Sequence, residues 1–262
     1  MSNSLLFAKA QSVKLTPFFL SVVLYFSLVR KDPQGELWTT VLKCLPIVAL
    51  ALYVLIKGFA LNKHYRRSQL ILLGLVFSCG GDALLNINLF PFGMVSFGVA
   101  HIFYISAFGW QPLKWLLGLC LYVPVTIFVI FVAKYLDEIL IIGVPIYCVL
   151  ISTMLWRSLA RAVDVKSFLT IFCAVGAALF VISDALIAVT MFLSVPLPGA
   201  RLQIMITYYI AQFAIALSTA DDGPAPKCKK TKLNNKNNSV KCSTRIHNQT
   251  ITTKISTSKI LA

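Results

Sequence analysis

The sequence predicts an all-α integral membrane protein of about eight transmembrane helices. Three observations carry this prediction. Hydrophobic residues make up 58% of the 262 residues and charged residues only 13%, and the mean hydropathy is +0.81. Apolar runs near the ~20 residues that cross a bilayer recur along the chain. A polar segment of different composition follows the last run, and no soluble domain with one core combines these features.

The apolar runs divide the chain into a transmembrane domain at 1–220 and a tail at 221–262. The first and fourth runs are short, and we expect them to tilt little or to extend into the interface. Pro46, Pro124 and Pro145 fall inside runs, where neighbouring helices accommodate a kink. The eight predicted spans are 15–29, 38–56, 69–89, 92–109, 113–132, 138–156, 167–193 and 202–219.

The tail is rich in Lys, Asn, Ser and Thr and nearly lacks aromatic residues, so it is predicted to be disordered. Nine of the 24 Lys and Arg residues follow Asp222, and most of the others fall between apolar runs. This distribution favours anionic lipid headgroups over nucleic acid as the partner of the net charge of +15. For the tail itself, a solvated segment without a specific role is favoured over a role at the lipid surface.

The loop charges predict the orientation of the chain. Eight spans place both termini on one side, and that side carries ten of the Lys and Arg residues outside the tail, against four on the other. The positive-inside rule therefore places both termini in the cytoplasm. The glycosylation-like triplets Asn237-Asn238-Ser239 and Asn248-Gln249-Thr250 would then be unmodified.

Cysteine and histidine give no sign of a metal or of disulfides. The seven Cys residues show no CxxC spacing, and five lie in apolar runs, where cysteine usually acts as a small hydrophobic residue. The three His residues are scattered, so we expect neither zinc nor another cofactor. The first apolar run leads to Arg30-Lys31 without a signal-peptide cleavage site.

Two aspartates interrupt the apolar runs in a similar way. Asp82 lies in Gly80-Gly81-Asp82-Ala83-Leu84-Leu85, and Asp184 in Ser183-Asp184-Ala185-Leu186. They fall in the third and seventh spans, which predicts a parallel four-plus-four internal repeat. At 1.5 Å per residue both lie in the outer half of the membrane. A carboxylate at this depth is costly, and two at similar depth favour a functional role over a structural one.

Other polar residues share this layer and are candidates for binding or positioning a substrate. Each also has a structural alternative: an interhelical hydrogen bond, a satisfied bundle histidine, or a basic side chain that snorkels or anchors at the interface. Gly80 and Gly81 permit close approach of a backbone or a substrate, or serve packing alone. The candidates are Lys43, Ser78, Asn86, His101, Tyr104, Arg201, Tyr208 and Gln212.

Two carboxylates close together in a low dielectric do not both ionise easily, so the pair tends to hold one proton. This places a general acid beside a general base without a metal. The residues alone leave three candidates open: hydrolysis of an acid-labile bond in a lipid, intramembrane proteolysis, and proton-coupled transport.

Several segments carry a resemblance to a known family: the two Asp segments, Phe97-Gly98-Val99-Ala100-His101-Ile102-Phe103-Tyr104, Tyr208-Tyr209-Ile210-Ala211-Gln212 and the stretch from Lys43 to Pro46. Together they resemble the lysoplasmalogenase (YhhN-type) multi-span membrane family. The resemblance covers nearly all of 15–219. It implies hydrolysis of the vinyl ether bond of lysoplasmalogens to a fatty aldehyde and glycerophosphoethanolamine or glycerophosphocholine, and an endoplasmic reticulum membrane in animals. The resemblance does not extend to the basic tail and implies no function for it.

For that reaction one Asp would protonate the vinyl ether carbon while the other, ionised, stabilises the resulting cation and activates water. The sequence does not decide which is which, and we take Asp82 as the acid. Lys43 and Arg201 would hold the phosphate. The other candidates would position water and the glycerol oxygens, with the alkyl chain between helices.

Two rival functions use the same pair of aspartates. An intramembrane aspartyl protease needs a glycine three residues before the first Asp, where Cys79 stands, and a tyrosine directly before the second, where Ser183 stands. A proton-coupled transporter suits paired carboxylates and a repeat, and is the stronger alternative. A purely structural membrane protein would tolerate changes at both aspartates.

Overall fold

The computed structural model describes residues 2–29, 35–56, 65–221, 239–246 and 249–256, with side chains described from residue 11 to residue 220 outside the gaps. Within these residues, eight helices are long and apolar enough to cross a membrane. They are α1 (Ser2–Leu28), α2 (Leu37–Ile56), α3 (Arg66–Asn86), α4 (Phe90–Phe108), α5 (Trp115–Ala133), α6 (Leu140–Val165), α7 (Phe168–Phe192) and α8 (Ala200–Leu217), and a short 3₁₀ turn, η2 (Ser218–Asp221), follows α8.

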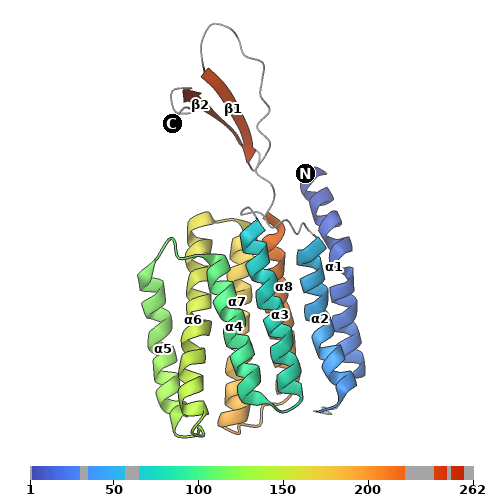
Figure 1. Ribbon diagram of the computed structural model, residues 1–262, viewed down its shortest axis with the longest axis vertical. Helices are drawn as coiled ribbons and strands as arrows, with labels where there is room; N and C mark the ends of the chain where they lie inside the picture. Colours follow the sequence, from blue (N-terminus) through green and yellow to red (C-terminus); the bar gives the residue numbers. More distant parts are fainter. Residues whose placement is uncertain (1, 30–34, 57–64, 222–238, 247–248, 257–262) are drawn as a thin grey trace. The chain divides into compact units, whose positions relative to one another are not determined.

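The eight predicted spans are confirmed, and the chain is a multi-pass integral membrane protein. The largest differences are at the ends: α1 begins well before the predicted span, and α6 continues nine residues past the predicted end at 156. Pro46, Pro124 and Pro145 lie inside helices, as the spans require. α1 begins and α8 ends at the same end of the bundle (Figure 1).

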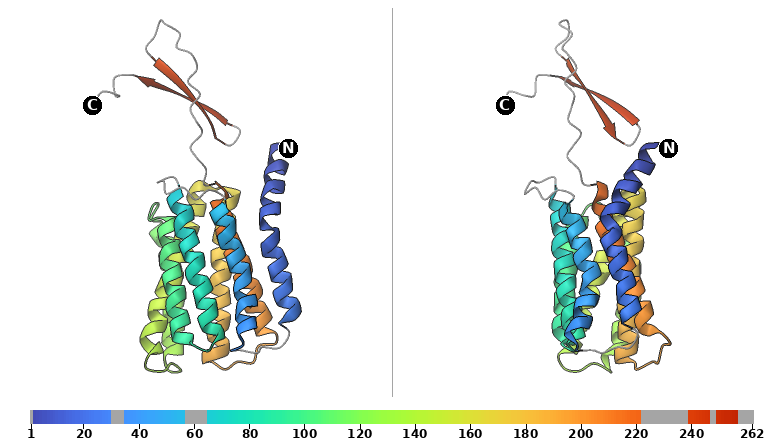
Figure 2. Two further views of the ribbon diagram at one scale, coloured as in Figure 1. Left: turned by 45° about the vertical axis from the view of Figure 1, so that its right-hand side comes forward. Right: turned by 90° about the vertical axis from the view of Figure 1, so that its right-hand side faces the viewer.

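Two pairs of consecutive helices make the most extensive contacts, α3 with α4 and α7 with α8 (Figures 1 and 2). Both pairs use a glycine for close approach. A Cβ atom at Gly81 would lie 2.6 Å from the ring of Phe97, and one at Gly176 would lie 2.5 Å from the Cβ of Ala214. Gly81 therefore serves the packing of α3 on α4. The predicted four-plus-four repeat stays a prediction.

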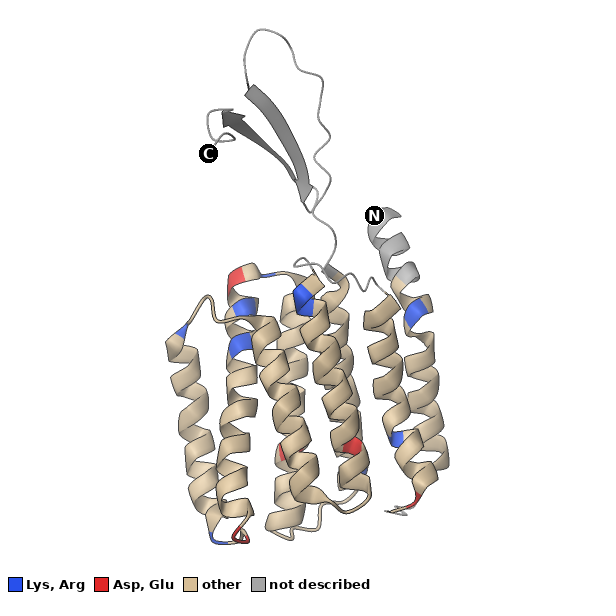
Figure 3. Cartoon of the chain, in the orientation of Figure 1, with Lys and Arg blue, Asp and Glu red and all other residues tan. Residues whose placement is uncertain are grey.

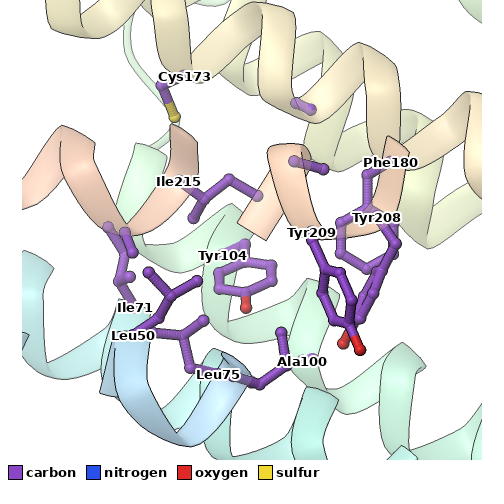
Figure 4. Packing of buried hydrophobic residues seen from close by; sticks show 14 of the residues in the cluster. Leu50, Ile71, Leu75, Ala100, Tyr104, Cys173, Phe180, Tyr208, Tyr209 and Ile215 are labelled. Carbon is purple, nitrogen blue, oxygen red and sulfur yellow. The ribbon is translucent and has the colours of Figure 1, made fainter. Parts of the chain in front are cut away.

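The interior of the bundle is apolar but contains several tyrosines. Tyr104, Tyr208 and Tyr209 lie among aliphatic side chains such as Leu75 and Ile215 (Figure 4). Their hydroxyl groups need hydrogen-bond partners there, because an unpaired polar group in a low dielectric costs free energy. Lys and Arg side chains gather near the two ends of the helices (Figure 3). The few buried polar groups between these ends are therefore the features that need an explanation.

The chain beyond Asp222 forms a separate unit, which we describe by itself. In it, β1 (Ser239–Ile246) pairs antiparallel with β2 (Gln249–Ser256). Val240, Thr244, Ile251 and Ile255 of these strands are β-branched residues, which favour extended backbone. The other residues of the segment lie outside the described part of the chain, and the disorder predicted for the tail stays a prediction.

Candidate active site

The two aspartates predicted to form the site line one cavity of about 270 Å³ inside the bundle. Helices α2 to α8 all contribute to its wall, and the wall is mostly apolar. The polar residues in the wall are few: Lys43, Asp82, Tyr147, Cys148, Ser152, Ser183, Asp184 and Tyr208. Segments about a hundred residues apart in the sequence therefore meet at one place.

Asp82 of α3 is almost fully buried, with 2% of its surface exposed. The Tyr208 hydroxyl of α8 donates a hydrogen bond of 2.6 Å to its Oδ2 atom. The Nζ atom of Lys43 on α2 lies 3.7 Å from its Oδ1 atom. Lys43 is held in turn by the Tyr209 hydroxyl, which donates to its backbone carbonyl at 2.9 Å. A cation and a donor thus both face the Asp82 carboxylate, which favours its ionised form.

Asp184 of α7 has a different set of partners. The Tyr147 hydroxyl of α6 donates a hydrogen bond to its Oδ2 atom. Behind Tyr147, the Nε2 atom of His101 lies 3.1 Å from the same hydroxyl. Since Tyr147 donates its only proton to Asp184, His101 donates to Tyr147, which leaves Nδ1 as the deprotonated ring nitrogen. His101 is fully buried and its Nδ1 has no hydrogen-bond partner. No cationic side chain pairs with Asp184 within the described residues.

The two carboxyl groups line the same cavity. Among the described hydrogen bonds none joins Asp82 to Asp184, and each carboxyl group takes its bond from a different tyrosine. A proton shared directly between the two acids is therefore not part of this structure. The cavity that both groups line instead has room for water or for part of a substrate.

Three of the predicted positioning residues form one buried chain of hydrogen bonds beside the cavity. The Tyr104 hydroxyl donates to Oε1 of Gln212 at 2.8 Å and lies 3.3 Å from the Ser78 hydroxyl. All three side chains are buried, and none of them lines the cavity. The chain joins α3, α4 and α8, so these residues fit the structural alternative better than contact with a substrate.

Asn86 and Arg201 are also absent from the wall of the cavity. The Asn86 side-chain amide donates to Thr40 Oγ1 at 2.7 Å and to Thr39 Oγ1 at 3.1 Å, which ties α3 to the start of α2. Arg201 donates to the Tyr25 hydroxyl of α1 at 3.1 Å, and its guanidinium carbon lies 5.8 Å from the centre of that ring. Both residues connect helices, and the structure does not bring them to the carboxylates.

Sequence reasoning missed Tyr147. It lies in Pro145-Ile146-Tyr147 within an apolar run, where a lone tyrosine is typical of a residue at the membrane interface. The available signal was depth: Tyr147 is about as far from the start of α6 as Asp184 is from the end of α7. No group of three His, Cys, Asp or Glu residues in the described part of the chain is placed to hold a metal ion.

The fold and the site define a class: a multi-pass helical membrane protein with two intramembrane carboxylates, Asp82 buried and Asp184 partly buried, facing one mostly apolar cavity. The profile of the YhhN family matches residues 38–219, which is more than half of the chain. The chain belongs to the YhhN family. The matched residues begin in α2 and end in η2, so they include every helix that lines the cavity.

Named relatives support this membership. The chain is 35% identical to human lysoplasmalogenase TMEM86A over 234 residues, covering 86% of this chain and 97% of the relative. It is 35% identical to human lysoplasmalogenase TMEM86B over 81% of this chain and 88% of the relative. The mouse TMEM86B protein is 34% identical, over 78% and 85%. No solved structure matches this chain.

Proposed function

We propose that this protein is a lysoplasmalogenase-like hydrolase. It cleaves the vinyl ether bond of 1-alkenyl glycerophosphoethanolamine or glycerophosphocholine, releasing a fatty aldehyde and the glycerophospho-alcohol. The observation that carries the proposal is that Asp82 and Asp184 line one mostly apolar cavity within the bundle. The pair occurs in a chain that is similar, along nearly its whole length, to proteins named lysoplasmalogenase.

The contacts of the two aspartates support different catalytic roles for them. Lys43 lies beside Asp82 and favours the ionised form, so Asp82 acts as base and as the stabiliser of positive charge. Asp184 is faced by the neutral side chain of Tyr147 and retains its proton, so Asp184 acts as the general acid. This assignment reverses the one that we took from the sequence. The reason is the position of Lys43, which the sequence did not assign to either Asp.

The reaction proceeds in three steps with four proton transfers. Asp184 donates its proton to the outer alkene carbon, which gives an oxocarbenium-like cation. Water then attacks the carbon bonded to oxygen while Asp82 accepts a proton from that water, which gives a hemiacetal. In the last step Asp184 accepts the hemiacetal hydroxyl proton and Asp82 donates its proton to the departing glycerol oxygen. The two carboxyl groups end in their starting states, so the cycle needs no external proton carrier.

The cavity wall suits this chemistry. Its apolar lining keeps bulk water from the cation, while the carboxylate of Asp82 stabilises it. Among the described residues Lys43 is the one cationic side chain in the wall, and we assign it to the phosphate as well as to Asp82. Arg201 contacts Tyr25 away from the cavity, so we no longer assign it to the phosphate.

The test is aldehyde release by the purified full-length protein in detergent. We expect turnover of a 1-alkenyl lysophospholipid and none of the matched 1-acyl lipid, because only the vinyl ether is activated by carbon protonation. Turnover without two compartments also excludes transport as the sole activity. Absence of aldehyde from protein that is monodisperse and folded would contradict the proposal.

We further propose an endoplasmic reticulum membrane with both termini in the cytoplasm. The endoplasmic reticulum follows from the family resemblance, and the orientation from the excess of Lys and Arg in the loops on one side. Asn237 and Asn248 lie in glycosylation-like triplets of the tail and report on the orientation. We expect both to be unmodified in microsomes, and glycosylation at either would place the tail on the opposite side.

A further inference from the structure

The helix α5 is attached to the bundle along one side. Among the described helices its one extensive contact is with α6. The contact is close: the Tyr122 hydroxyl lies 2.6 Å from Thr153 Oγ1, and a Cβ atom at Gly118 would lie 2.9 Å from the Trp156 ring. The helix α7 packs extensively on α6 and α8 instead. No extensive helix–helix contact therefore closes the space between α5 and α7.

The cavity extends into this space. Pro124, Val125 and Phe128 of α5 line the same cavity as Asp184 and Ala188 of α7. The side chains of α6 that line the cavity also point toward the space between α5 and α7. Tyr147 faces α7, and Thr153 and Trp156 face α5. Cys148 and Ser152, which also line the cavity, lie between these two faces at 100° per residue. A strip of α6 thus forms the floor of a passage between α5 and α7.

The passage and the opposite end of the cavity differ in polarity. At the opposite end are Lys43, Asp82 and Tyr208, and Asp82 is only 2% exposed. Toward the passage the wall is mostly apolar, with Ser152 as a small polar residue in its floor, and Ala185 at its edge is exposed. Such an exposed position faces hydrocarbon in a membrane protein. A molecule with an anionic headgroup and one hydrocarbon chain fits this arrangement, with the headgroup at the end that contains Lys43 and the chain in the passage.

We propose that the alkenyl chain of the substrate leaves the cavity between α5 and α7, over Ala185 and Ala188 and against Phe128. This inference rests on the proposed function, and it names the part of the site that selects the hydrocarbon chain. Small side chains on α7 leave the width that a chain needs, and Phe128 sets the opposite wall. The substrate enters sideways from the bilayer, with its headgroup ending beside Lys43.

The first experiment maps the chain without requiring hydrolysis. Full-length protein is photolabelled with a saturated 1-alkyl lysophosphocholine that carries a diazirine at the end of its chain. Labelled peptides from α5 and α7 support the passage, provided that unlabelled alkyl lysophosphocholine removes the label. Labels confined to other helices, or a label that only diacyl phosphatidylcholine removes, overturn it.

The second experiment measures chain selectivity. Ala188→Phe narrows the passage, and Val175→Phe, at an exposed position of the same helix, is the matched control. We expect Ala188→Phe to raise KM for a hexadecenyl substrate by about tenfold and to leave a hexenyl substrate unchanged, whereas Val175→Phe alters neither. Equal effects on both chain lengths, or no effect, overturn the passage.

A widening variant covers the case in which Ala188→Phe does not fold. Phe128→Ala should raise kcat/KM for a branched alkenyl chain relative to a straight one, and an unchanged ratio overturns the proposal. The two proposals fail differently. If wild-type protein releases no aldehyde from any chain length, the hydrolase is wrong, while the photolabel still decides where the chain of a bound lysolipid lies.

Discussion

Asp82 and Asp184 are both aspartates in similar sequence segments, but the side chains that surround them in the bundle differ. Each carboxyl group accepts a hydrogen bond from one tyrosine, the buried Tyr208 or the partly buried Tyr147. Within the described part of the chain only Asp82 also has a cation, since Lys43 lies 3.7 Å away. Behind Tyr147 is a buried His101 instead. The comparison teaches that two similar sequence segments place acids in one cavity, while residues from other helices decide which charged and polar groups face each of them.

The largest expected effect is loss of either carboxyl group. Asp184→Asn and Asp82→Asn should each lower aldehyde release by about 10²–10⁴-fold, the range that general acid–base groups contribute. Both variants keep the size of the side chain, so size-exclusion profiles should match the wild type. Near-normal turnover in either variant would show that the substituted Asp is not a catalytic acid or base.

The next effect concerns the cation that distinguishes the two sites. Lys43→Met leaves the buried Asp82 charge without a partner, which costs ~3–5 kcal/mol in comparable buried pairs, and should lower turnover by about 10²-fold. The thermal midpoint of the detergent-solubilised protein reports the stability. The double variant Lys43→Met with Asp82→Asn should recover much of the lost stability, because both members of the pair are then neutral. Additive losses would show that Lys43 and Asp82 do not depend on each other.

The two tyrosines test the assigned protonation states. Removing a hydrogen bond to a charged group costs ~1.5–3 kcal/mol, against ~0.5–1.5 kcal/mol for a neutral one. Tyr208→Phe should therefore destabilise the protein more than Tyr147→Phe, if Asp82 is ionised and Asp184 is neutral. Melting curves of the two variants, measured side by side, give the comparison. The opposite order would exchange the roles of acid and base.

The smallest effect on catalysis is expected outside the cavity. Asn86→Ala removes the hydrogen bonds to Thr39 and Thr40 and should cost ~0.6–1.7 kcal/mol of stability, the range measured for interhelical hydrogen bonds in membranes. The kcat value should stay within about twofold of the wild type. A large fall in kcat with an unchanged melting curve would indicate that Asn86 acts in the active site.

Much of the architecture could be predicted because hydrocarbon imposes simple requirements. A span needs about twenty apolar residues in a helix that satisfies its own backbone, and that rule located all eight helices. The same rule made Asp82 and Asp184 conspicuous, since a carboxyl group in an apolar run is expensive. It gave no information on Tyr147, because a tyrosine in a span is unremarkable by composition.

The sequence by itself determined the spans, the depth of the two acids and the family motifs around them, because each of these is a local property of a run of residues. Only the tertiary structure decided which polar groups meet. It placed Lys43 beside Asp82, gave Asp184 the Tyr147 hydroxyl, and directed Asn86 and Arg201 into contacts between helices. The physical reason is that pairing depends on how the helices are rotated and packed against one another. Those rotations are set by contacts such as Gly81 against Phe97, which join residues on different helices and follow no period within either.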